Sequence, residues 1–588
     1  MSEVQRSVRR GFADAGDVDR FLEMLGRYER GELGADAWRA FRLLRGAYPQ
    51  RQAEANMLRV KVPQGILDGD GLRALAEVAE RDARGVAHVT TRENVQLHFI
   101  ATADLAPAMR RLAAAGLTTV EACGNSVRNV VGCPYAGVSV DEVFDPTPYA
   151  EAVTRHFLRH PLASTLPRKF KIGFEGCATD HVLTPIHDLG FRALRRGGRR
   201  GFAVSAAGGT ATMCTGGYPI ADFLPAGEVL ALVEAVLSVF HRLGDREHRQ
   251  RNRMKFLVKQ LGWERFRAEV ELERVRIREA GGVPLSFDPE EPREESAPPP
   301  RAAPQALAPG EGFAAWSRTN VRPQRQAGFS VATAALPLGD ATSRQLRALA
   351  ALASAFGDGT VRLTPRQDAV LRWVRVEALP ALHRGLDAAG LARDGAGTAA
   401  DVVSCPGADS CRLAVTHSRG VGRLIEARVR ADPRLAATSD GVSVNVSGCP
   451  NGCAQHHVAA IGLQGSARKV DGRAAPQYFV LVGGGAAQGR AHFGRIAAKV
   501  PARRTPEAVA RLLSLFRAEA APGEDATTFF ARLPVERAKA ALKDLEPLDP
   551  ATAAPLDFVE PGEQRPFEVG SGAEAVPAPP VAAAPART

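Results

Sequence analysis

Cysteine is scarce in this chain, which has only eight among 588 residues. That number is too small for a fold held together by disulfides. No run approaches the roughly 18 apolar residues that a membrane span needs, and the N-terminal segment carries charges throughout without the apolar stretch of a secretory signal. These absences predict a cytoplasmic protein that does not enter a membrane.

A dinucleotide-binding motif is also missing. No GxGxxG lies between a predicted strand and a helix, so the sequence shows no flavin or nicotinamide domain. The net charge of +11 predicts attraction to anions or acidic partners. Nucleic acid is the generic alternative, but Lys and Arg are scattered along the chain and no nucleic-acid motif appears. A chain of 588 residues is too long for one core, so we expect several domains.

Four of the eight cysteines fall in two short segments, Cys405-Pro-Gly-Ala-Asp-Ser-Cys411 and Cys449-Pro-Asn-Gly-Cys453. Their spacing differs from the C-x2-C pairs that hold tetrahedral zinc. A [4Fe–4S] cluster needs four thiolates around one cubane, and Pro and Gly suit loops whose backbone amides point at cluster sulfides. Two unrelated cysteine-rich turns are the alternative. Because cysteine is so scarce elsewhere, the clustering favours an iron–sulfur site.

The chain contains two copies of one unit. Residues 72–76 (LRALA) recur unchanged at 346–350, an offset of 274 (346 − 72). At the same offset the predicted helix at 105–117 matches 379–391 without a gap, and Arg92 matches Arg366. A common offset over that length predicts an internal duplication.

The cysteine positions can be compared between the copies at an offset of 272 (405 − 133). The pairs are Cys405 with Cys133, Cys449 with Cys177, Cys411 with Ser139 and Cys453 with His181. The first copy therefore keeps two of the four thiols and cannot build a four-cysteine cluster of its own. We expect one cluster in the molecule.

The first copy contributes basic residues in three stretches: TTRENVQLH (90–98), NSVRNVV (125–131) and LPRKFKIGF (166–174). On a strand, Lys169 and Lys171 share one face, and two neighbouring ammonium groups repel each other unless an anion lies between them. A solvated strand face is the alternative for the lysines. Structural ion pairs are the alternative for Arg92 and Arg128.

These motifs, in this order over roughly residues 40–545, resemble the ferredoxin-dependent assimilatory nitrite and sulfite reductases that contain sirohaem and a [4Fe–4S] cluster. The resemblance implies an α+β fold of two pseudo-symmetric halves, each with a ferredoxin-like repeat and a sirohaem and Fe–S domain. It also implies that Cys405, Cys411, Cys449 and Cys453 bind the cluster, and that Cys453 bridges to the sirohaem iron.

The same resemblance assigns the basic residues. Its catalytic set, facing the anionic substrate, is Arg92, Arg128, Lys169 and Lys171. Its neighbours of the macrocycle are Arg168, Gln96 and Asn451. Sirohaem carries eight carboxylates, so its pocket must be basic, and Arg suits bidentate pairing with carboxylates.

The implied reaction is the six-electron reduction of sulfite to sulfide, with electrons from a separate ferredoxin or flavoprotein. Members that act on sulfite typically have Lys-x-Lys at this strand, whereas plant-type nitrite reductases have Lys-x-Asn. Lys169 and Lys171 therefore favour sulfite, since a second cation suits a dianion. Reduction of nitrite to ammonia is the alternative.

Two further readings are weaker. A cobalamin-pathway Fe–S monooxygenase shares the scaffold, but the Lys-x-Lys and the distal arginines are intact here. A non-enzymatic Fe–S role leaves the basic residues unexplained. Tyr48 and Cys133 match positions that can be covalently linked in some bacterial ferredoxin-dependent sulfite reductases. Alternatively, Tyr48 packs and Cys133 is a buried relic of the duplication.

The predicted organisation has seven segments. They are an N-terminal helical segment (1–45), a first ferredoxin-like half-domain (46–120), a first sirohaem-reductase repeat with the basic residues (121–285), a Pro-rich linker (286–312), a second ferredoxin-like half-domain (313–395), a second repeat with the cluster cysteines (396–548) and a disordered tail (549–588).

Overall fold

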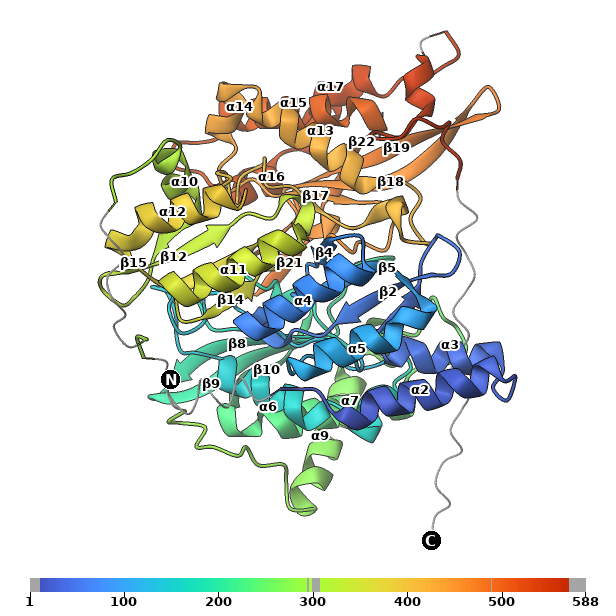
Figure 1. Ribbon diagram of the computed structural model, residues 1–588, viewed down its shortest axis with the longest axis vertical. Coiled ribbons are helices and arrows are strands. Elements are labelled where there is room, and N and C mark those ends of the chain that lie inside the picture. Colours follow the sequence, from blue (N-terminus) through green and yellow to red (C-terminus); the bar gives the residue numbers. More distant parts are fainter. Residues whose placement is uncertain (1–10, 293–295, 299–306, 488, 552, 570–588) are drawn as a thin grey trace.

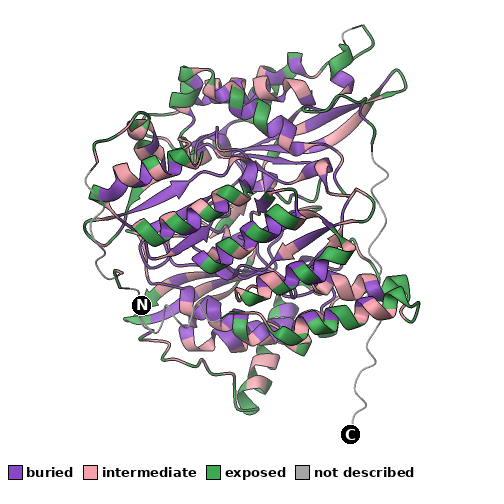
Figure 2. Ribbon diagram, viewed as in Figure 1, coloured by how far each residue is buried: buried purple, intermediate pink, exposed green. Residues whose placement is uncertain are grey.

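The computed structural model describes residues 11–292, 296–298, 307–487, 489–551 and 553–569. Parts of the expected linker and tail, and the first ten residues, lie outside these ranges. Sheets form the buried interior of the molecule, and the helices around them carry exposed outer faces (Figures 1 and 2). Among the described residues, no helix is both long enough and apolar enough to cross a membrane.

The N-terminal segment forms two helices, α2 (Ala15–Glu29) and α3 (Ala35–Leu44). Phe21 and Trp38 are buried between them with ring centroids 5.4 Å apart. Asp14 caps α2 by accepting a hydrogen bond from the Gly16 amide at 2.9 Å. This helical pair joins the core of the first ferredoxin-like sheet.

Each half of the chain then builds a five-stranded antiparallel sheet covered by two helices. The first has the order β1-β2-β5-β4-β13 and the second β11-β12-β15-β14-β3. The bounds are β1 Ala47–Pro49, β2 Ala55–Val60, β3 Ile66–Asp68, α4 Gly69–Asp82, β4 Val86–Val89, β5 Val95–Ala101, α5 Leu105–Ala114, α10 Phe313–Asn320, β11 Val321–Pro323, β12 Phe329–Ala334, β13 Asp340–Thr342, α11 Ser343–Phe356, β14 Thr360–Leu363, β15 Ala369–Arg375 and α12 Leu379–Ala388.

The two sheets exchange their edge strands. β3 from the first half pairs with β14, and β13 from the second half pairs with β4. Helices α4 and α11 lie side by side (Figure 1), and one apolar core runs through both sheets. The two ferredoxin-like sheets therefore form one joined unit, which the sequence did not predict.

Two larger sheets complete the fold, with the orders β10-β9-β8-β7-β6 and β16-β17-β18-β19-β22. The bounds in the first are β6 Val131–Gly132, α6 Thr147–Phe157, β7 Ile172–Glu175, β8 Leu189–Arg196, β9 Arg199–Ala206, β10 Tyr218–Pro225, α7 Val229–Leu243, α8 Met254–Leu261 and α9 Trp263–Glu279. Those in the second are β16 Val403–Ser404, α13 Ser418–Arg430, α14 Pro433–Thr438, β17 Val444–Ser447, β18 Ile461–Val470, β19 Arg473–Val482, β22 Arg495–Pro501, α15 Thr505–Glu519, α16 Ala526–Arg532 and α17 Val535–Leu542. Between β19 and β22, the strands β20 Gly485–Ala487 and β21 Arg490–His492 form a separate two-stranded sheet.

The strand registers of these sheets repeat. Val131 pairs with Gly173 in parallel β6 and β7, and Val403 pairs with Asn445 in parallel β16 and β17. Both partners are displaced by the offset of 272 residues (403 − 131 and 445 − 173). The predicted α+β fold of two pseudo-symmetric halves is confirmed.

The tail differs from its prediction in one part. Phe558 and Phe567 are buried, and the Phe567 amide donates to the Phe558 carbonyl at 2.7 Å. Phe558 packs in a small apolar cluster with Val470 and Leu548. Apolar side chains within a Pro-rich sequence are sufficient to fix this stretch against the second half.

Candidate functional site

The four cysteines of the two CP motifs lie at one edge of the second large sheet. Cys405 directly follows β16, and Cys449 lies two residues after β17. Because these neighbouring strands are parallel, their ends bring the two motifs together. Burial, and then the nearby thiols of Cys453 and Cys405, raise the pKa of Cys411 to about 11. The same neighbours and burial raise the pKa of Cys449.

Backbone amides surround these thiols. The Gly448 amide lies 3.4 Å from the Cys405 sulfur. The amide of Asn451 points at the Cys449 thiol, and those of Leu413 and Ala414 point at Cys411. Amides aimed at sulfur stabilise the negative charge of thiolates and of an iron–sulfur cluster. The four cysteines and their amides therefore fit a [4Fe–4S] cluster. Asn451 takes part through its backbone, and its side chain is exposed.

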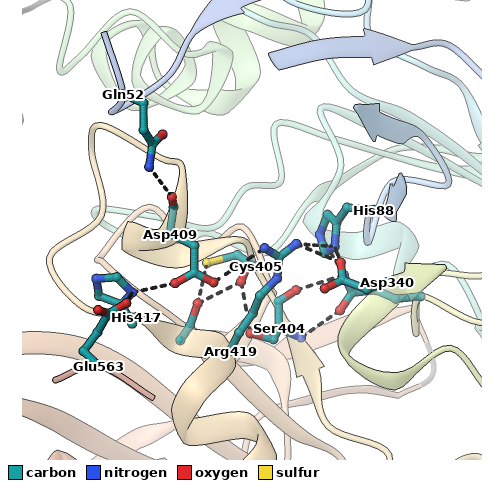
Figure 3. A network of polar contacts seen from close by, with 11 residues as sticks. Gln52, His88, Asp340, Ser404, Cys405, Asp409, His417, Arg419 and Glu563 are labelled. Carbon is teal, nitrogen blue, oxygen red and sulfur yellow. Dashed lines mark hydrogen bonds and ion pairs between the residues drawn. The ribbon is translucent and has the colours of Figure 1, made fainter. Parts of the chain in front are cut away.

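A buried polar network supports the loop that follows Cys405 (Figure 3). The Ser418 hydroxyl donates to the Cys405 carbonyl at 2.8 Å. Asp409 accepts from His417 at 2.5 Å, and Arg419 joins Asp409 to Asp340 of the exchanged strand β13. His88 of β4 completes the chain of contacts with Asp340 at 2.9 Å. The cluster loop is thus fixed to the first ferredoxin-like sheet, through one strand from each half of the chain.

The basic residues of the first copy form a second group that is close to this loop. Burial, and then the charges of Arg128 and Arg253, lower the pKa of Lys169 to about 7. Burial, Arg253 and Lys169 hold the pKa of Lys171 well below its usual value. Burial lowers the pKa of Arg92 to about 9. Like charges that lower each other's pKa form a site that favours an anion.

Two contacts join the halves at this point. Cys453 of the cluster loop lies close enough to Lys169 of the basic group to interact with it electrostatically. The Thr91 hydroxyl, beside Arg92, donates to the Cys453 carbonyl at 2.7 Å. The structure therefore brings together the cysteines of the second copy and the cations of the first.

Three functional candidates were missed by sequence reasoning: His187, Asp188 and Arg253. Asp188 is fully buried and accepts from the Lys171 amide at 2.9 Å and from Arg253 at 2.8 Å. His187 Nε2 lies 2.9 Å from the Arg92 guanidinium. The basic run RQRNRMK at residues 249–255 is the signal in the sequence that could have pointed to Arg253.

The basic residues also suit a polycarboxylate macrocycle. The Nε atoms of Arg59 and Arg92 and the Oε1 atom of Gln96 are buried without a hydrogen-bond partner among the described residues. Arg168 is close enough to Arg128 to lower the pKa of that guanidinium, and burial lowers its own pKa. Unpaired guanidinium nitrogens beside other cations suit the carboxylates of sirohaem.

The sequence left Cys133 between a link to Tyr48 and a buried position, and the structure shows the buried position. The Cys133 sulfur lies 3.5 Å from that of Cys177 and 3.4 Å from His181 Nδ1. Tyr48 instead interacts with Cys123: burial and then that thiol raise the pKa of the phenol. Cys133 follows β6, so the strand carries it toward the end of β7 and away from β1.

Comparison with known proteins identifies two kinds of repeated domain. The nitrite and sulphite reductase 4Fe-4S domain matches residues 123–277 and 396–546. The nitrite/sulfite reductase ferredoxin-like half domain matches residues 48–115 and 322–389. Both models therefore match twice, at positions that correspond between the copies.

Similar proteins include reductases of both anions. A ferredoxin--nitrite reductase of Synechococcus elongatus is 31% identical over 438 residues, which cover 73% of this chain and 80% of that protein. A sulfite reductase [ferredoxin] of Mycobacterium tuberculosis is 32% identical over 418 residues, covering 70% of each. The solved structure of the Mycobacterium tuberculosis NirA protein aligns with a TM-score of 0.75 and 27% identity, covering 89% of this chain and 95% of that one.

Proposed function

The chain belongs to the nitrite and sulphite reductase family, and from this premise we propose that it reduces sulfite to sulfide with electrons from ferredoxin. It is an oxidoreductase of the family that uses sirohaem and a [4Fe–4S] cluster. Reduction of nitrite to ammonia is the second candidate, because relatives of similar identity are named for that activity.

The cofactor ligands in this proposal come from the second copy. Cys405, Cys411, Cys449 and Cys453 would hold the cluster, and the Cys453 thiolate would also serve the sirohaem iron. When bound, the coupled cofactors supply single electrons to the substrate anion. The residues Arg168, Gln96, Arg59 and the backbone of Asn451 hold or border the cofactors.

The first copy binds the anion and supplies protons. Arg92 and Arg128 attract it and orient its oxygens through charge-assisted hydrogen bonds. The Nζ atom of Lys169, whose pKa is lowered to about 7, can give up a proton near neutral pH as an oxygen leaves as water. An anion between Lys169 and Lys171 raises the pKa of both amines and so keeps the next proton in place. The cations also stabilise charge on the departing oxygen.

One observation carries the proposal. The first copy brings five basic side chains close enough to act on one another electrostatically: Arg92, Arg128, Lys169, Lys171 and Arg253. Lys169 also lies close enough to Cys453 for an electrostatic interaction. Asp188 is the acid that this group shares, through Arg253 and the Lys171 amide. In an ordinary surface patch such side chains would be exposed to solvent, whereas these five are buried or half-buried.

The preference for sulfite rests on the second lysine. Lys171 adds a cation beside Lys169, and a dianion with three oxygens gains more from it than nitrite does. A net charge of +11 suits an acidic ferredoxin as donor. We place the reaction in the cytoplasm, since the cluster cysteines must remain reduced until they bind iron.

The test is kinetics on both anions with reduced ferredoxin, comparing the unmodified enzyme with Lys171→Asn. We expect kcat/KM for sulfite to fall about 10- to 100-fold, as for loss of one hydrogen bond to a charged group, and that for nitrite to fall less. Lys259→Asn, on an exposed position of α8, is the matched control and should change neither value. Equal losses on both anions would remove the preference for sulfite.

A further inference from the structure

A second group of metal-binding side chains lies in the first copy, outside the site described above. Cys133, Glu175, Cys177 and His181 place their ligand atoms all within 4.8 Å of one another. In the part of the chain that the structure describes, this is the one group of three or more such side chains with that property. We propose that these four residues bind a single zinc ion.

The distances between the ligand atoms suit one tetrahedral ion. The Cys133 sulfur lies 3.5 Å from the Cys177 sulfur and 3.4 Å from His181 Nδ1. His181 Nδ1 lies 3.6 Å from Glu175 Oε2. With Zn–S bonds of about 2.3 Å and Zn–N or Zn–O bonds of about 2.0–2.2 Å, a tetrahedron separates its ligand atoms by about 3.3–3.8 Å. These three separations lie within that range, and the remaining ones are no more than 4.8 Å.

The sheet explains why the ligands converge. Cys133 directly follows β6, and Glu175 is the last residue of the parallel neighbour β7. The loop after β7 then folds around the carboxylate, because Glu175 accepts from the amides of Cys177 at 2.9 Å and His181 at 2.6 Å. Backbone bonds to a carboxylate ligand fix its orientation and leave further lone pairs for a metal.

Burial and charge also favour a cation here. Cys133 and Glu175 are fully buried and Cys177 is only 2% exposed, so a carboxylate and two thiols share a dry space. Ionised groups in such a space need a positive partner. Zinc binding releases the protons of both thiols to solvent.

The set of four donors distinguishes zinc from the other uses of two close cysteines. A disulfide between Cys133 and Cys177 would need an oxidant and would leave His181 and Glu175 without a role. A [4Fe–4S] cluster takes thiolates at all four corners in most proteins. Two thiolates, an imidazole and a carboxylate are borderline ligands of the kind that zinc accepts, and four protein ligands make the closed site of a structural ion.

The ion would fix a loop that joins the halves. Residues 133–142 pack against the second ferredoxin-like sheet, where Tyr135 also stacks edge-on against His181 at 4.8 Å. The hydrogen bonds across this interface are Arg325 N to Val138 O at 2.9 Å, Gln326 Nε2 to Gly137 O at 3.0 Å and Arg372 NH1 to Ala136 O at 2.6 Å. Loss of the metal would therefore loosen the contact between residues 133–142 and the second ferredoxin-like sheet.

Elemental analysis of the purified holoprotein tests the proposal without any turnover. We expect close to one zinc per chain in the unmodified protein and in Cys214→Ser, a cysteine outside both metal groups. Cys177→Ser should lose the zinc while the sirohaem and cluster absorption bands persist. Zinc below about a tenth per chain in the unmodified protein, or zinc unchanged in Cys177→Ser, would overturn the proposal.

Two further measurements cover failure of one variant to fold. His181→Ser changes a partly exposed ligand and should also lose zinc. Protein grown with cobalt should show the visible bands of tetrahedral thiolate-bound Co²⁺, absent in His181→Ser and present in Cys214→Ser. A Cys133–Cys177 disulfide by mass spectrometry, or iron instead of zinc at this position, would contradict the assignment. None of these readouts depends on which anion the enzyme reduces.

Discussion

The same sheet edge carries different ligands in the two halves of the molecule. In the second half, the residues after β16 and β17 supply four cysteines surrounded by backbone amides. In the first half, the residues after β6 and β7 supply two cysteines, a histidine and a glutamate. At the offset of 272, Cys405 corresponds to Cys133, Cys449 to Cys177, Cys453 to His181, Cys411 to Ser139 and Ser447 to Glu175. The backbone fixes where a metal site lies, and the side chains fix which metal suits it.

The halves also hold each other by equivalent contacts. In each half, the turn after the first short strand (β1 or β11) forms a hydrogen bond with the loop of the other half that carries metal-ligand cysteines. The equivalent bonds between the halves are Arg51 N to Ser410 O at 2.8 Å and Arg325 N to Val138 O at 2.9 Å. Within each half, the same turn accepts an equivalent bond, from Phe99 N to Gln50 Oε1 at 3.0 Å and from Trp373 N to Gln324 Oε1 at 2.8 Å. The duplicated backbone has therefore kept its interface while its sites diverged.

A second difference concerns the duplicated arginines. Arg366 bonds both the carboxylate of Asp401, at 3.2 Å, and the carbonyl of that residue, at 3.0 Å. Arg92 bonds the corresponding carbonyl of Asn129 at 2.5 Å but has no carboxylate from that position. The second copy neutralises its guanidinium locally. The first copy leaves its charge to act on an anion.

The largest difference is expected when the corresponding metal ligand is removed from each half in turn. Cys453→Ser should lose both the cluster and the sirohaem, with activity falling more than about 100-fold, because outer-shell changes alone already cost up to that much. His181→Ser, the equivalent change in the first half, should keep both absorption spectra and rates within about twofold while losing zinc. Visible spectra and sulfite turnover measure this. A Cys453→Ser enzyme with full haem content would contradict the assignment of that thiolate.

Giving Arg92 an acidic partner should have the next largest effect. Asn129→Asp copies Asp401 into the first half and should lower kcat/KM for sulfite about 10- to 100-fold, since a bond to a charged group is worth about 1.5–3 kcal/mol. The Asn129 amide donates to Val62 O at 2.7 Å and Arg92 O at 3.1 Å, so the variant must be checked for folding by its cofactor content.

Asp401→Asn is the control for that exchange. It changes the matching acid in the second half, which does not face the basic group, and should alter kcat/KM less than about twofold. Normal sulfite kinetics in a folded Asn129→Asp enzyme would show that the charge of Arg92 does not act on substrate.

Local patterns allowed much of this molecule to be predicted from its sequence. Cys405, Cys411, Cys449 and Cys453 form two short motifs, and the constant offset exposed the duplication and hence the two pseudo-symmetric halves. The exchange of β3 and β13 could not be seen, because strands of three residues are too short to produce a periodic signal.

Features that depend on packing were out of reach. Arg253 lies far along the chain from Lys171 and meets it only because Asp188 binds both. Sequence alignment of the halves placed His181 opposite Cys453 but gave no reason for a metal site, since the direction of the Glu175 side chain at the end of β7 was unknown. The sequence pattern singled out Cys133 beside Tyr48, whereas the fold brings Cys123 close to that phenol and Cys133 to Cys177.

The smallest expected effect comes from replacing Arg51 or Arg325, the corresponding arginines that each contact one of the two metal loops. Arg51 donates from its side chain to Ala414 O at 2.8 Å, in the cluster loop. Arg325 pairs with Glu142 at 3.6 Å, in the loop of the proposed zinc site. Replacing either with Ala should cost about 1–2 kcal/mol of stability, because each loses one partly buried charged contact while its backbone bond remains.

The two substitutions should weaken different metal sites. Arg51→Ala should bleach the cluster faster in air and leave zinc release to a chelator unchanged, because only the loop after Cys405 is loosened. Arg325→Ala should do the reverse, since it loosens residues 133–142. Absorbance decay and a zinc-responsive dye measure both rates on the same samples. If each variant accelerated both losses equally, the two loops would be coupled through the interface, and the independence of the two metal sites would be wrong.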